Sequence, residues 1–224
     1  MAGMKSVDVT GAAGRLIVRQ FNSPQDYQSC WQSMKDFTQS RDDATADEVW
    51  LLEHPPIFTQ GIRDGSHDLL DTGDIPVLKT DRGGLVTYHA PGQLIVYLML
   101  DLRRLGTGLR ELVNILEQVV IDLLSTCAIE ATRRKDAPGV YVDGRKIASL
   151  GLRVQRHCTY HGVSLNVDMD LEPFEQIVPC GLRDIKMIDM KSLGVTRDID
   201  DMSRHFVQVL SKRLRYNPDF QVMP

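Results

Sequence analysis

The chain has 224 residues, of which 42% are hydrophobic and 25% are charged, the composition of an ordinary globular protein. Its net charge of −4 lacks the basic excess that attracts nucleic acid. The longest apolar run, residues 94–100, is too short to cross a membrane, and residues 1–15 lack the pattern of a signal peptide. We therefore expect a cytoplasmic protein that binds neither nucleic acid nor membranes.

The first predicted elements are a strand over residues 15–21 and a helix that starts near Asp26. The Ser, Pro and Asp residues at 23–26 are typical of a helix start. Cys30 is assigned to the core, because it shares one helical face with Tyr27, Trp31, Met34 and Phe37.

Short strand-like runs follow, separated by turn residues rather than by helices. They cover residues 48–54, 56–61, 75–80, 84–90 and 93–100. This order predicts an antiparallel or mixed meander. The sequence Ala90-Pro91-Gly92-Gln93 favours a type II turn, so the last two runs are expected to form a hairpin with His89 at its mouth.

A long helix is expected after Thr107, whose side chain can cap it. Its apolar residues repeat at three and four positions and end near Cys127. Further strands are predicted at 139–144, 146–155 and 160–168.

A final helix is expected from Asp198, with Met202, Phe206, Leu210 and Leu214 on one face. Strands mostly in meanders with a few helices against them indicate an α+β fold with a mixed or antiparallel sheet. Because no linker, composition break or repeat divides the sequence, we expect one domain over residues 1–224.

The cysteines show no Cys-x-x-Cys pair of the kind found in structural zinc sites, so free thiols are expected. His157, Cys158 and His161 lie close together in sequence. Neighbouring strand residues point to opposite faces, however, which argues against a metal site there. His161 is better explained as a core or cleft histidine with one hydrogen-bond partner.

Cys180 differs from the other cysteines because it lies between Pro179 and Gly181, neither of which suits the interior of a helix or a central strand. A free thiol has a pKa of ~8.5, so only a few per cent is thiolate at neutral pH unless a cation lies beside it. Cys180 is therefore a candidate nucleophile that needs a basic partner.

Lys146 is the candidate partner. Asp143-Gly144 predicts a hairpin turn, and in the strand after it Lys146 shares its parity with apolar residues up to Val154. A buried ammonium tends to lose its proton, whereas a nearby thiolate favours the charged form. The alternative is that Lys146, close to the turn, reaches solvent. Gly83 and Gly84 would allow a ligand to approach the backbone closely, or merely shape a turn.

Five segments of the chain, in this order, carry the motifs of one family. They are EHPPIFTQG (53–61), RGGLVTYHAPGQLIVY (82–97), PGVYVDGRKIASLGLRV (138–154), HGVSLNV (161–167) and VPCG (178–181). By these residues the chain resembles the octanoyl-carrier-protein:protein octanoyltransferases, also called lipoyl(octanoyl) transferases. Each motif alone is weak, whereas the combination is specific.

The resemblance implies a reaction. Cys180 would take the octanoyl group from octanoyl-acyl carrier protein as a thioester, and Lys146 would lower the thiol pKa and move protons. The acyl group would then pass to a lysine of a lipoyl domain, in 2-oxoacid dehydrogenase complexes or in the glycine cleavage H protein. Neither ATP nor a metal nor another cofactor is expected, because transfer from thioester to amine is downhill.

The resemblance also implies the α+β fold of the biotin and lipoate ligase catalytic domains. The substrate-binding residues would be Arg82, Gly83, Gly84, Leu85, Val86, Thr87, Tyr88, His89, Ser149, Leu150, Gly151, Gly162, Val163 and Ser164. In an unbroken strand, Lys146 faces away from Ser149 and Gly151. One shared site would therefore need backbone contacts or a β-bulge near Gly151.

Two alternatives remain. An ATP-dependent lipoate or biotin ligase on the same fold would carry a longer glycine-rich motif and lysines for an acyl adenylate. A catalytically inactive carrier-binding module would need neither Cys180 nor Lys146. For the transferase, the basic clusters near Arg103, Arg133 and Arg145 are candidates for docking acidic carrier and lipoyl proteins. No heptad or interface pattern argues against a monomer.

Overall fold

The computed structural model describes residues 14–63, 69, 71–135, 137–178 and 185–223. Within them, a large sheet holds eight strands in the order β11-β1-β2-β6-β10-β9-β8-β7. β1 pairs in parallel with β11 and β2, and the other neighbours are antiparallel. The strands are β1 (Arg15–Phe21), β2 (Asp47–Leu52), β6 (Gln93–Met99), β7 (Thr132–Arg133), β8 (Val140–Val142), β9 (Arg145–Gln155), β10 (Cys158–Asn166) and β11 (Asn217–Met223).

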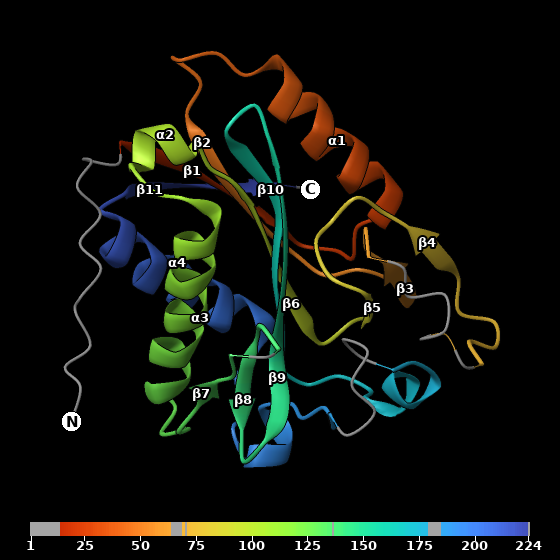
Figure 1. The fold of residues 1–224 in the computed structure, drawn as a ribbon. Helices are drawn as coiled ribbons and strands as arrows, with labels where there is room; N and C mark the ends of the chain where they lie inside the picture. The colour runs from red at the N-terminus through yellow and green to blue at the C-terminus, as the bar shows by residue number, and fades with distance from the viewer. Residues whose placement is uncertain (1–13, 64–68, 70, 136, 179–184, 224) are drawn as a thin grey trace.

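Helices cover both faces of this sheet (Figure 1). α3 (Leu109–Ser125) and α4 (Ile199–Leu214) pack on one face, where their leucines meet one set of alternating strand residues. α1 (Tyr27–Ser40) packs on the opposite face. Short helices complete the chain: α2 (Leu102–Leu105), η2 (Glu172–Gln176) and η4 (Lys191–Leu193). The predicted α+β fold with a mixed sheet and packed helices is confirmed.

A second sheet of three strands lies on the same side as α1 (Figure 1). Its order is β4-β3-β5, and its strands are β3 (Ile57–Gln60), β4 (Val77–Lys79) and β5 (Val86–His89). The predicted hairpin of β5 and β6 is therefore wrong, because β5 pairs with β3 and β6 lies between β2 and β10.

The turn between β5 and β6 nevertheless forms. Gln93 N donates to Ala90 O over 3.2 Å, and Gly92 has φ +85°, as the third position of a type II turn requires. A Cβ at Gly92 would lie 1.8 Å from Asp168 O, so only glycine fits. The turn sends the chain from the small sheet into the large one instead of folding it back.

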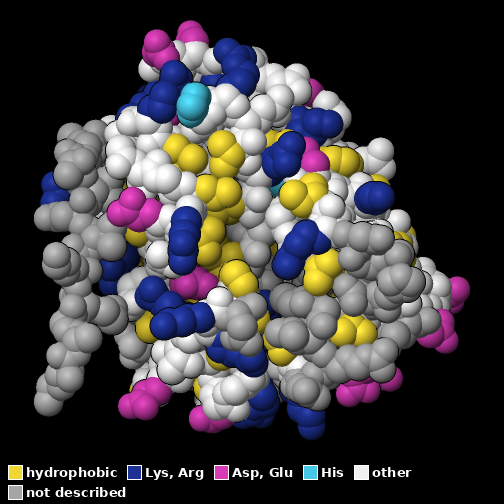
Figure 2. All heavy atoms as spheres, in the orientation of Figure 1, with side chains coloured by type: hydrophobic (Ala, Val, Ile, Leu, Met, Phe, Trp, Pro, Cys, Tyr) yellow, Lys and Arg dark blue, Asp and Glu magenta, His cyan; other side chains and the backbone are white. Residues whose placement is uncertain are grey.

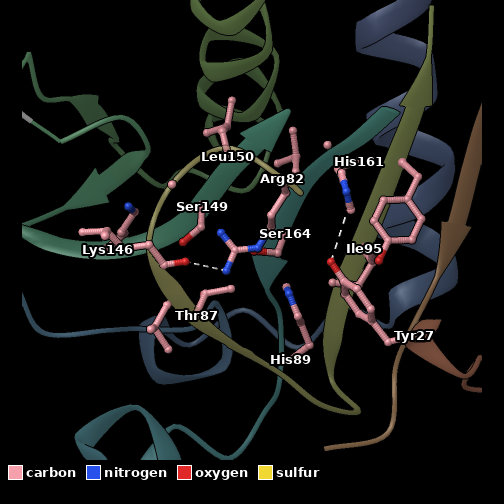
Figure 3. Close-up of a pocket in the computed structure, with 17 residues that line it drawn as sticks. Tyr27, Arg82, Thr87, His89, Ile95, Lys146, Ser149, Leu150, His161 and Ser164 are labelled. Carbon is pink, nitrogen blue, oxygen red and sulfur yellow. Dashed lines mark hydrogen bonds between the residues drawn. The ribbon is translucent and has the colours of Figure 1, made fainter. Parts of the chain in front are cut away.

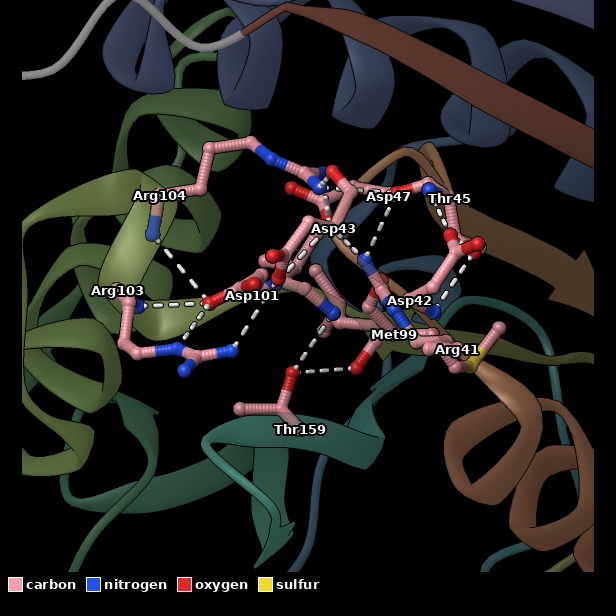
Figure 4. Close-up of polar contacts among 12 residues, drawn as sticks. Arg41, Asp42, Asp43, Thr45, Asp47, Met99, Asp101, Arg103, Arg104 and Thr159 are labelled. Carbon is pink, nitrogen blue, oxygen red and sulfur yellow. Dashed lines mark hydrogen bonds and ion pairs between the residues drawn. The ribbon is translucent and has the colours of Figure 1, made fainter.

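A buried polar cluster around Asp47 lies at the end of the large sheet where β2 begins (Figure 4). The Asp47 carboxylate accepts hydrogen bonds from Arg41, from Arg104 Nη1 at 3.1 Å, from the Asp101 backbone N at 3.0 Å and from the Tyr216 hydroxyl. The end of α1, the start of α2 and the chain after α4 therefore meet on one carboxylate. A buried charge with several donors is stable, whereas the same charge left unpaired is costly.

The helix starts at Asp26 and Asp198 are confirmed, since both side chains accept a hydrogen bond from the first helical turn. The predicted cap by Thr107 is wrong: α3 begins after Gly108, without a side-chain cap. No helix among the described residues has the length and apolar character needed to cross a membrane.

Candidate functional site

A pocket lies between the α1 face of the large sheet and the small sheet (Figure 3). It holds about 590 Å³ of empty space, including solvent at its mouth. Its lining comes from α1, β5, β6, β9, β10 and the loop that precedes β5. Segments far apart in sequence therefore meet at one cavity.

Strand register explains the floor of the pocket. Ser164 on β10 lies opposite Ile95 on β6 and Ser149 on β9. Two residues along, a second row places Gly162 on β10 between Tyr97 on β6 and Gly151 on β9. Because residues two apart on a strand share a face, both rows face the pocket. The floor is therefore a strip of serines and glycines across β10 and β9, with larger side chains on β6.

The roof is the loop around Arg82. Its buried guanidinium donates to Thr59 O at 2.6 Å, to Leu85 O at 2.7 Å and to Gly83 O at 3.0 Å. Three carbonyl groups of β3 and of the loop are thus tied to one side chain. Arg82 supports the conformation of the roof as well as lining the pocket.

Glycine allows the roof to approach the floor. A Cβ on Gly151 would lie 2.9 Å from Gly83 O, so a larger residue would lift the loop away from β9. The Gly83 backbone N donates to Leu152 O over 3.0 Å, which anchors the loop to the same strand.

Lys146 lines the pocket with only 1% of its surface exposed. Its Nζ donates to Pro138 O at 2.9 Å and lies 5.6 Å from the centre of the Tyr141 ring. A Cβ at Gly139 would come within 2.4 Å of Lys146 Cε, so that glycine makes room for the lysine chain. The expectation that Lys146 points inward is confirmed, and the alternative in which it reaches solvent is wrong.

A β-bulge brings Lys146 and Ser149 to the same pocket. Val140 pairs with Ala148, whereas the next residue, Tyr141, pairs with Lys146, so β9 carries one extra residue at Ile147. The bulge reverses the alternation between Lys146 and Ser149. Backbone contacts or a bulge near Gly151 were expected, and the bulge lies four residues earlier, at Ile147.

Cys180 lies outside the described residues, so its distance from Lys146 stays a prediction. The described segment that follows in the sequence lies beside Lys146. Lys146 N donates to Lys186 O at 2.8 Å, and Ile188 N donates to Lys146 O at 3.0 Å. Residues 186–188 therefore run along β9 at the position of Lys146.

His161 borders the opposite part of the pocket, with φ +59°, a left-handed conformation rare for residues other than glycine. Its Nε2 lies 2.9 Å from Asp81 Oδ1. Tyr160 donates to Asp81 Oδ2 at 2.5 Å and Trp31 donates to Oδ1 at 2.7 Å, so three side chains share one carboxylate. The backbone conformation at His161 lets Tyr160 and His161 face the same side, against strict alternation. The expectation of a cleft histidine is confirmed, but the ring has two hydrogen-bond partners where one was expected, because Nδ1 also lies 3.5 Å from the Tyr27 hydroxyl.

The protonation states in this group follow from burial and hydrogen bonding. Burial lowers the pKa of His161, and this outweighs the opposing effect of Asp81. Burial alone would raise the pKa of Asp81, but its hydrogen bonds with His161 and Tyr160 outweigh it and lower the pKa. We therefore assign a neutral imidazole beside a carboxylate, with Nε2 as the donor.

His89 lines the pocket and His54 lies behind it, and both are next to the Tyr27 ring. Burial lowers the pKa of His54 to about 4, and burial also places the pKa of His89 well below the usual value. A neutral histidine has one donor and one acceptor nitrogen, so each ring sets a direction for its hydrogen bonds.

A directed chain of hydrogen bonds joins the roof to the segment beside Lys146. His89 Nδ1 donates to Gln93 Oε1 at 2.7 Å, so His89 Nε2 accepts from the Thr59 hydroxyl at 3.3 Å. Gln93 Nε2 in turn donates to Asn166 Oδ1 at 2.9 Å. The whole chain runs in order through Arg82, Thr59, His89, Gln93, Asn166 and Ile188 O.

Most of the predicted substrate-binding residues border this one pocket: Arg82, Gly84, Leu85, Val86, Thr87, His89, Ser149, Leu150, Gly151, Gly162, Val163 and Ser164. Leu150 and Val163 turn their side chains toward the α3 and α4 core, and Figure 3 shows Leu150 pointing away from the cavity. Gly83 and Tyr88 do not line it. Tyr88 packs against Phe58 and Phe174 on the other side of β5.

Sequence reasoning missed three lining residues, Tyr27, Ile95 and Tyr97, and it identified His161 as a core or cleft histidine without assigning it to the substrate site. The first three follow the apolar periodicity of α1 and β6, so they look like ordinary core residues. Only His161 carried a signal, because it begins the H-G motif.

Two of the described cysteines are poor nucleophiles. Burial raises the pKa of Cys30 to about 12 and also raises the pKa of Cys158. Both side chains are buried, and Cys30 packs among apolar residues of α1 and β6, as expected for a core cysteine. Among the described residues, no group of three or more His, Cys, Asp or Glu side chains is placed to hold a metal ion.

Comparisons with known proteins agree with this architecture. Residues 26–211 match the family model of the lipoyl protein ligase A/B catalytic domain. An octanoyltransferase of Nitrosococcus oceani is 55% identical over 196 residues, which cover 88% of each chain.

Two solved structures share the fold. One is a bipartite lipoate protein ligase and its E2 lipoyl domain from Thermoplasma acidophilum, with a TM-score of 0.75 and 14% identity over 94% of this chain and 87% of that one. The other is a lipoate-protein ligase A bound with ATP, with a TM-score of 0.75 and 14% identity over 94% and 89%. The expected ligase-type fold is confirmed, and the chain belongs to the octanoyltransferase family of lipoyl protein ligase A/B catalytic domains.

Proposed function

We propose that this chain transfers an octanoyl group from octanoyl-acyl carrier protein to a lysine of lipoyl domains, through a thioester on Cys180. An octanoyltransferase relative at 55% identity supports the overall reaction. The observation that carries the chemistry is a fully buried lysine on the wall of a pocket floored by small residues. Such a pocket suits an alkyl chain, since each buried methylene is worth ~0.8 kcal/mol.

The first step forms the acyl-enzyme. The Cys180 thiolate attacks the thioester carbonyl of the phosphopantetheine arm, a new carbon–sulfur bond forms, and the phosphopantetheine sulfur leaves and takes up a proton. We assign Lys146 two roles in this step: its ammonium favours the Cys180 thiolate, and it supplies the proton to the departing sulfur.

The second step releases the product. The amine of the lipoyl-domain lysine attacks the acyl-enzyme carbonyl, an amide bond forms, and the Cys180 sulfur departs as thiolate. The attacking amine loses one proton, which we assign to the neutral Lys146 amine left by the first step, so the ammonium–thiolate pair is restored. The two steps balance without ATP, a metal or a redox partner.

The position of Lys146 supports its role. Residues 186–188, which follow the undescribed segment 179–184, pair with the strand position of Lys146. A buried ammonium that already contacts Pro138 O and the Tyr141 ring is held in place before the substrate arrives.

Acyl carrier proteins and lipoyl domains are typically acidic, so a basic surface favours their docking. Figure 2 shows Lys and Arg side chains across the middle of one face, with many of the Asp and Glu side chains nearer its rim. The side chains of Arg103, Arg133 and Arg145 are 60%, 35% and 42% exposed, which leaves them accessible to a partner. Charge reversal at a docking site raises KM for the carrier, whereas an unchanged KM shows that the cluster is only solvated surface.

We assign this activity to a single domain over residues 1–224, acting as a monomer in the cytoplasm. Its protein substrates are the lipoyl domains of 2-oxoacid dehydrogenase complexes and the glycine cleavage H protein.

The experiment that tests the function mixes the chain with octanoyl-acyl carrier protein and a lipoyl domain, without nucleotide. We expect an octanoyl amide on the lipoyl-domain lysine, detected by intact mass. Formation of that product only with ATP and free fatty acid would support a ligase instead. No product under either condition would contradict both activities and favour a carrier-binding module.

A further inference from the structure

The strip of small residues on the pocket floor ends at β6. Ser149, Ser164 and Ile95 lie in one row across three neighbouring strands, and Gly151, Gly162 and Tyr97 lie in the next. The small serines leave space above β9 and β10, whereas at Gly151 the roof loop comes down to the floor. The two β6 side chains are large. A ligand that follows the strip from Lys146 therefore meets Ile95 and Tyr97 at its end.

Figure 3 shows these two ends, with Lys146 on one side of the pocket and Ile95, Tyr27 and His161 on the other. Behind Ile95 lies an apolar cluster that includes Cys30, Met34, Trp50 and Leu52. Ile95 thus separates the pocket from apolar residues. Removing part of its side chain would lengthen the pocket into an apolar space and leave the polar residues of the wall in place.

We propose that Ile95 sets the length of acyl chain that the pocket accepts. The inference rests on the proposed function, and it adds a residue that determines specificity at the end of the pocket remote from the reacting carbonyl. The acyl carbonyl lies near Lys146, the alkyl chain lies over Ser149 and Ser164, and the terminal methyl contacts Ile95.

The dimensions fit an eight-carbon chain. From Ile95 to Ser149 the floor crosses two strand spacings, about 10 Å, and Lys146 lies three residues further along β9, about another 10 Å. The Cα atoms of Ile95 and Lys146 are therefore about 14 Å apart. The Lys146 side chain reaches Pro138 O, just before β8, on the side of β9 away from Ile95, so it leaves this span open. An extended octanoyl group spans about 9 Å at ~1.3 Å per bond, given a C–C bond of ~1.5 Å.

The test is competition among hexanoyl-, octanoyl-, decanoyl- and dodecanoyl-acyl carrier proteins for the chain, with the acyl-enzyme read by intact mass. Ile95→Ala makes room for about two methylenes. Since burying one methylene raises affinity by about fourfold, we expect the ratio of decanoyl to octanoyl loading to rise by up to about 15-fold. Ile95→Phe is expected to shift loading toward hexanoyl. Ile95→Val, the mildest change, raises the decanoyl ratio by up to about fourfold and serves if Ile95→Ala fails to fold.

Leu94→Ala is the matched control. Leu94 is the neighbouring residue of β6, is fully buried, and packs on the opposite face with the α3 and α4 core. This variant loses a similar amount of core packing but leaves the pocket unchanged. We therefore expect the same ratio of decanoyl to octanoyl loading as in the parent. If the Ile95 variants load octanoyl with the parent's chain-length profile, or if Leu94→Ala changes the profile equally, Ile95 does not set the length. If the parent itself loads no acyl group from any carrier, the proposed function fails instead.

Discussion

Replacing Lys146 with methionine separates the chemistry of the lysine from its packing. Methionine has similar length and no charge, so it fills the channel beside Gly139 without an ammonium. The variant loses the hydrogen bond to Pro138 O and the contact with the Tyr141 ring, worth about 1–3 kcal/mol together. It also no longer buries an ammonium, which offsets that loss. We expect the free energy of unfolding to change by less than about 2 kcal/mol.

The rate of acyl-enzyme formation is expected to fall much further. Without a neighbouring cation, a thiol with a pKa of ~8.5 is about 3% thiolate at pH 7. If the thiol is fully ionised in the parent, the acylation rate of the variant should therefore be about 30-fold lower. Raising the pH from 7 to 8.5 should increase the acylation rate of the variant by about 16-fold, because half of the thiol is then ionised. The parent should change little over the same range.

The assay is single-turnover acylation by octanoyl-acyl carrier protein from pH 6.5 to 9, quenched and read by intact mass. Lys186→Met is the matched control, because Lys186 is exposed and lies on the segment that pairs with Lys146. A Lys146→Met variant with the parent's rate and pH profile would remove Lys146 from the mechanism. A lower rate that does not recover with pH would refute its effect on thiol ionisation.

Three further predictions follow from buried groups. Asp47→Asn leaves Arg41 without its buried counter-charge, so we expect the free energy of unfolding in urea to fall by about 3–5 kcal/mol. Asp219→Asn, at an exposed ion pair, should lower it by less than about 1 kcal/mol. Equal losses would contradict the role of burial. Because burial lowers the pKa of His54 to about 4, the unfolded chain binds a proton first as the pH falls below ~6.5. This contribution to stability is therefore complete above pH 6.5 and falls by up to about 3 kcal/mol toward pH 4. His54→Gln should make the fall of stability measured by unfolding at each pH less steep, and the lowered pKa values of His89 and His161 account for a remaining slope. At pH 7, iodoacetamide should leave Cys30 unmodified in the native chain, as peptide mapping would show, because burial raises the pKa of its thiol to about 12; rapid labelling would contradict this.

Local patterns predicted the elements well, because a helix or strand repeats over a distance that the sequence itself displays. The Asp26 and Asp198 helix starts and the turn at Asp143 follow from side-chain and turn chemistry within a few residues. The strand β11 was not predicted, since its side chains are mostly exposed and alternate weakly, and it forms by pairing with β1.

Strand partners could not be predicted from such local signals. The turn at Gly92 has the expected geometry, yet β5 and β6 diverge because each finds a partner far away in sequence. The same limit applies to side-chain direction. One extra residue at Ile147 and a positive φ at His161 each reverse the alternation, and neither leaves a mark in the sequence.

Site residues could be predicted from the sequence where their type is unusual for the element in which they lie. Lys146 stood out because a lysine in an apolar strand needs an explanation, and the Gly83-Gly84 pair stood out because it permits close backbone approach. Tyr27 and Ile95 could not be separated from the core, because a pocket wall obeys the same apolar periodicity as a packed interior.

The central claim is that Cys180 carries the octanoyl group, and the most direct test is intact mass after the chain meets octanoyl-acyl carrier protein without a lipoyl domain. We expect one octanoyl adduct that hydroxylamine removes, that maps to Cys180, that Cys180→Ala abolishes, and that a lipoyl domain then discharges. An unmodified chain, or an adduct on Cys30, Cys127 or Cys158, would contradict it.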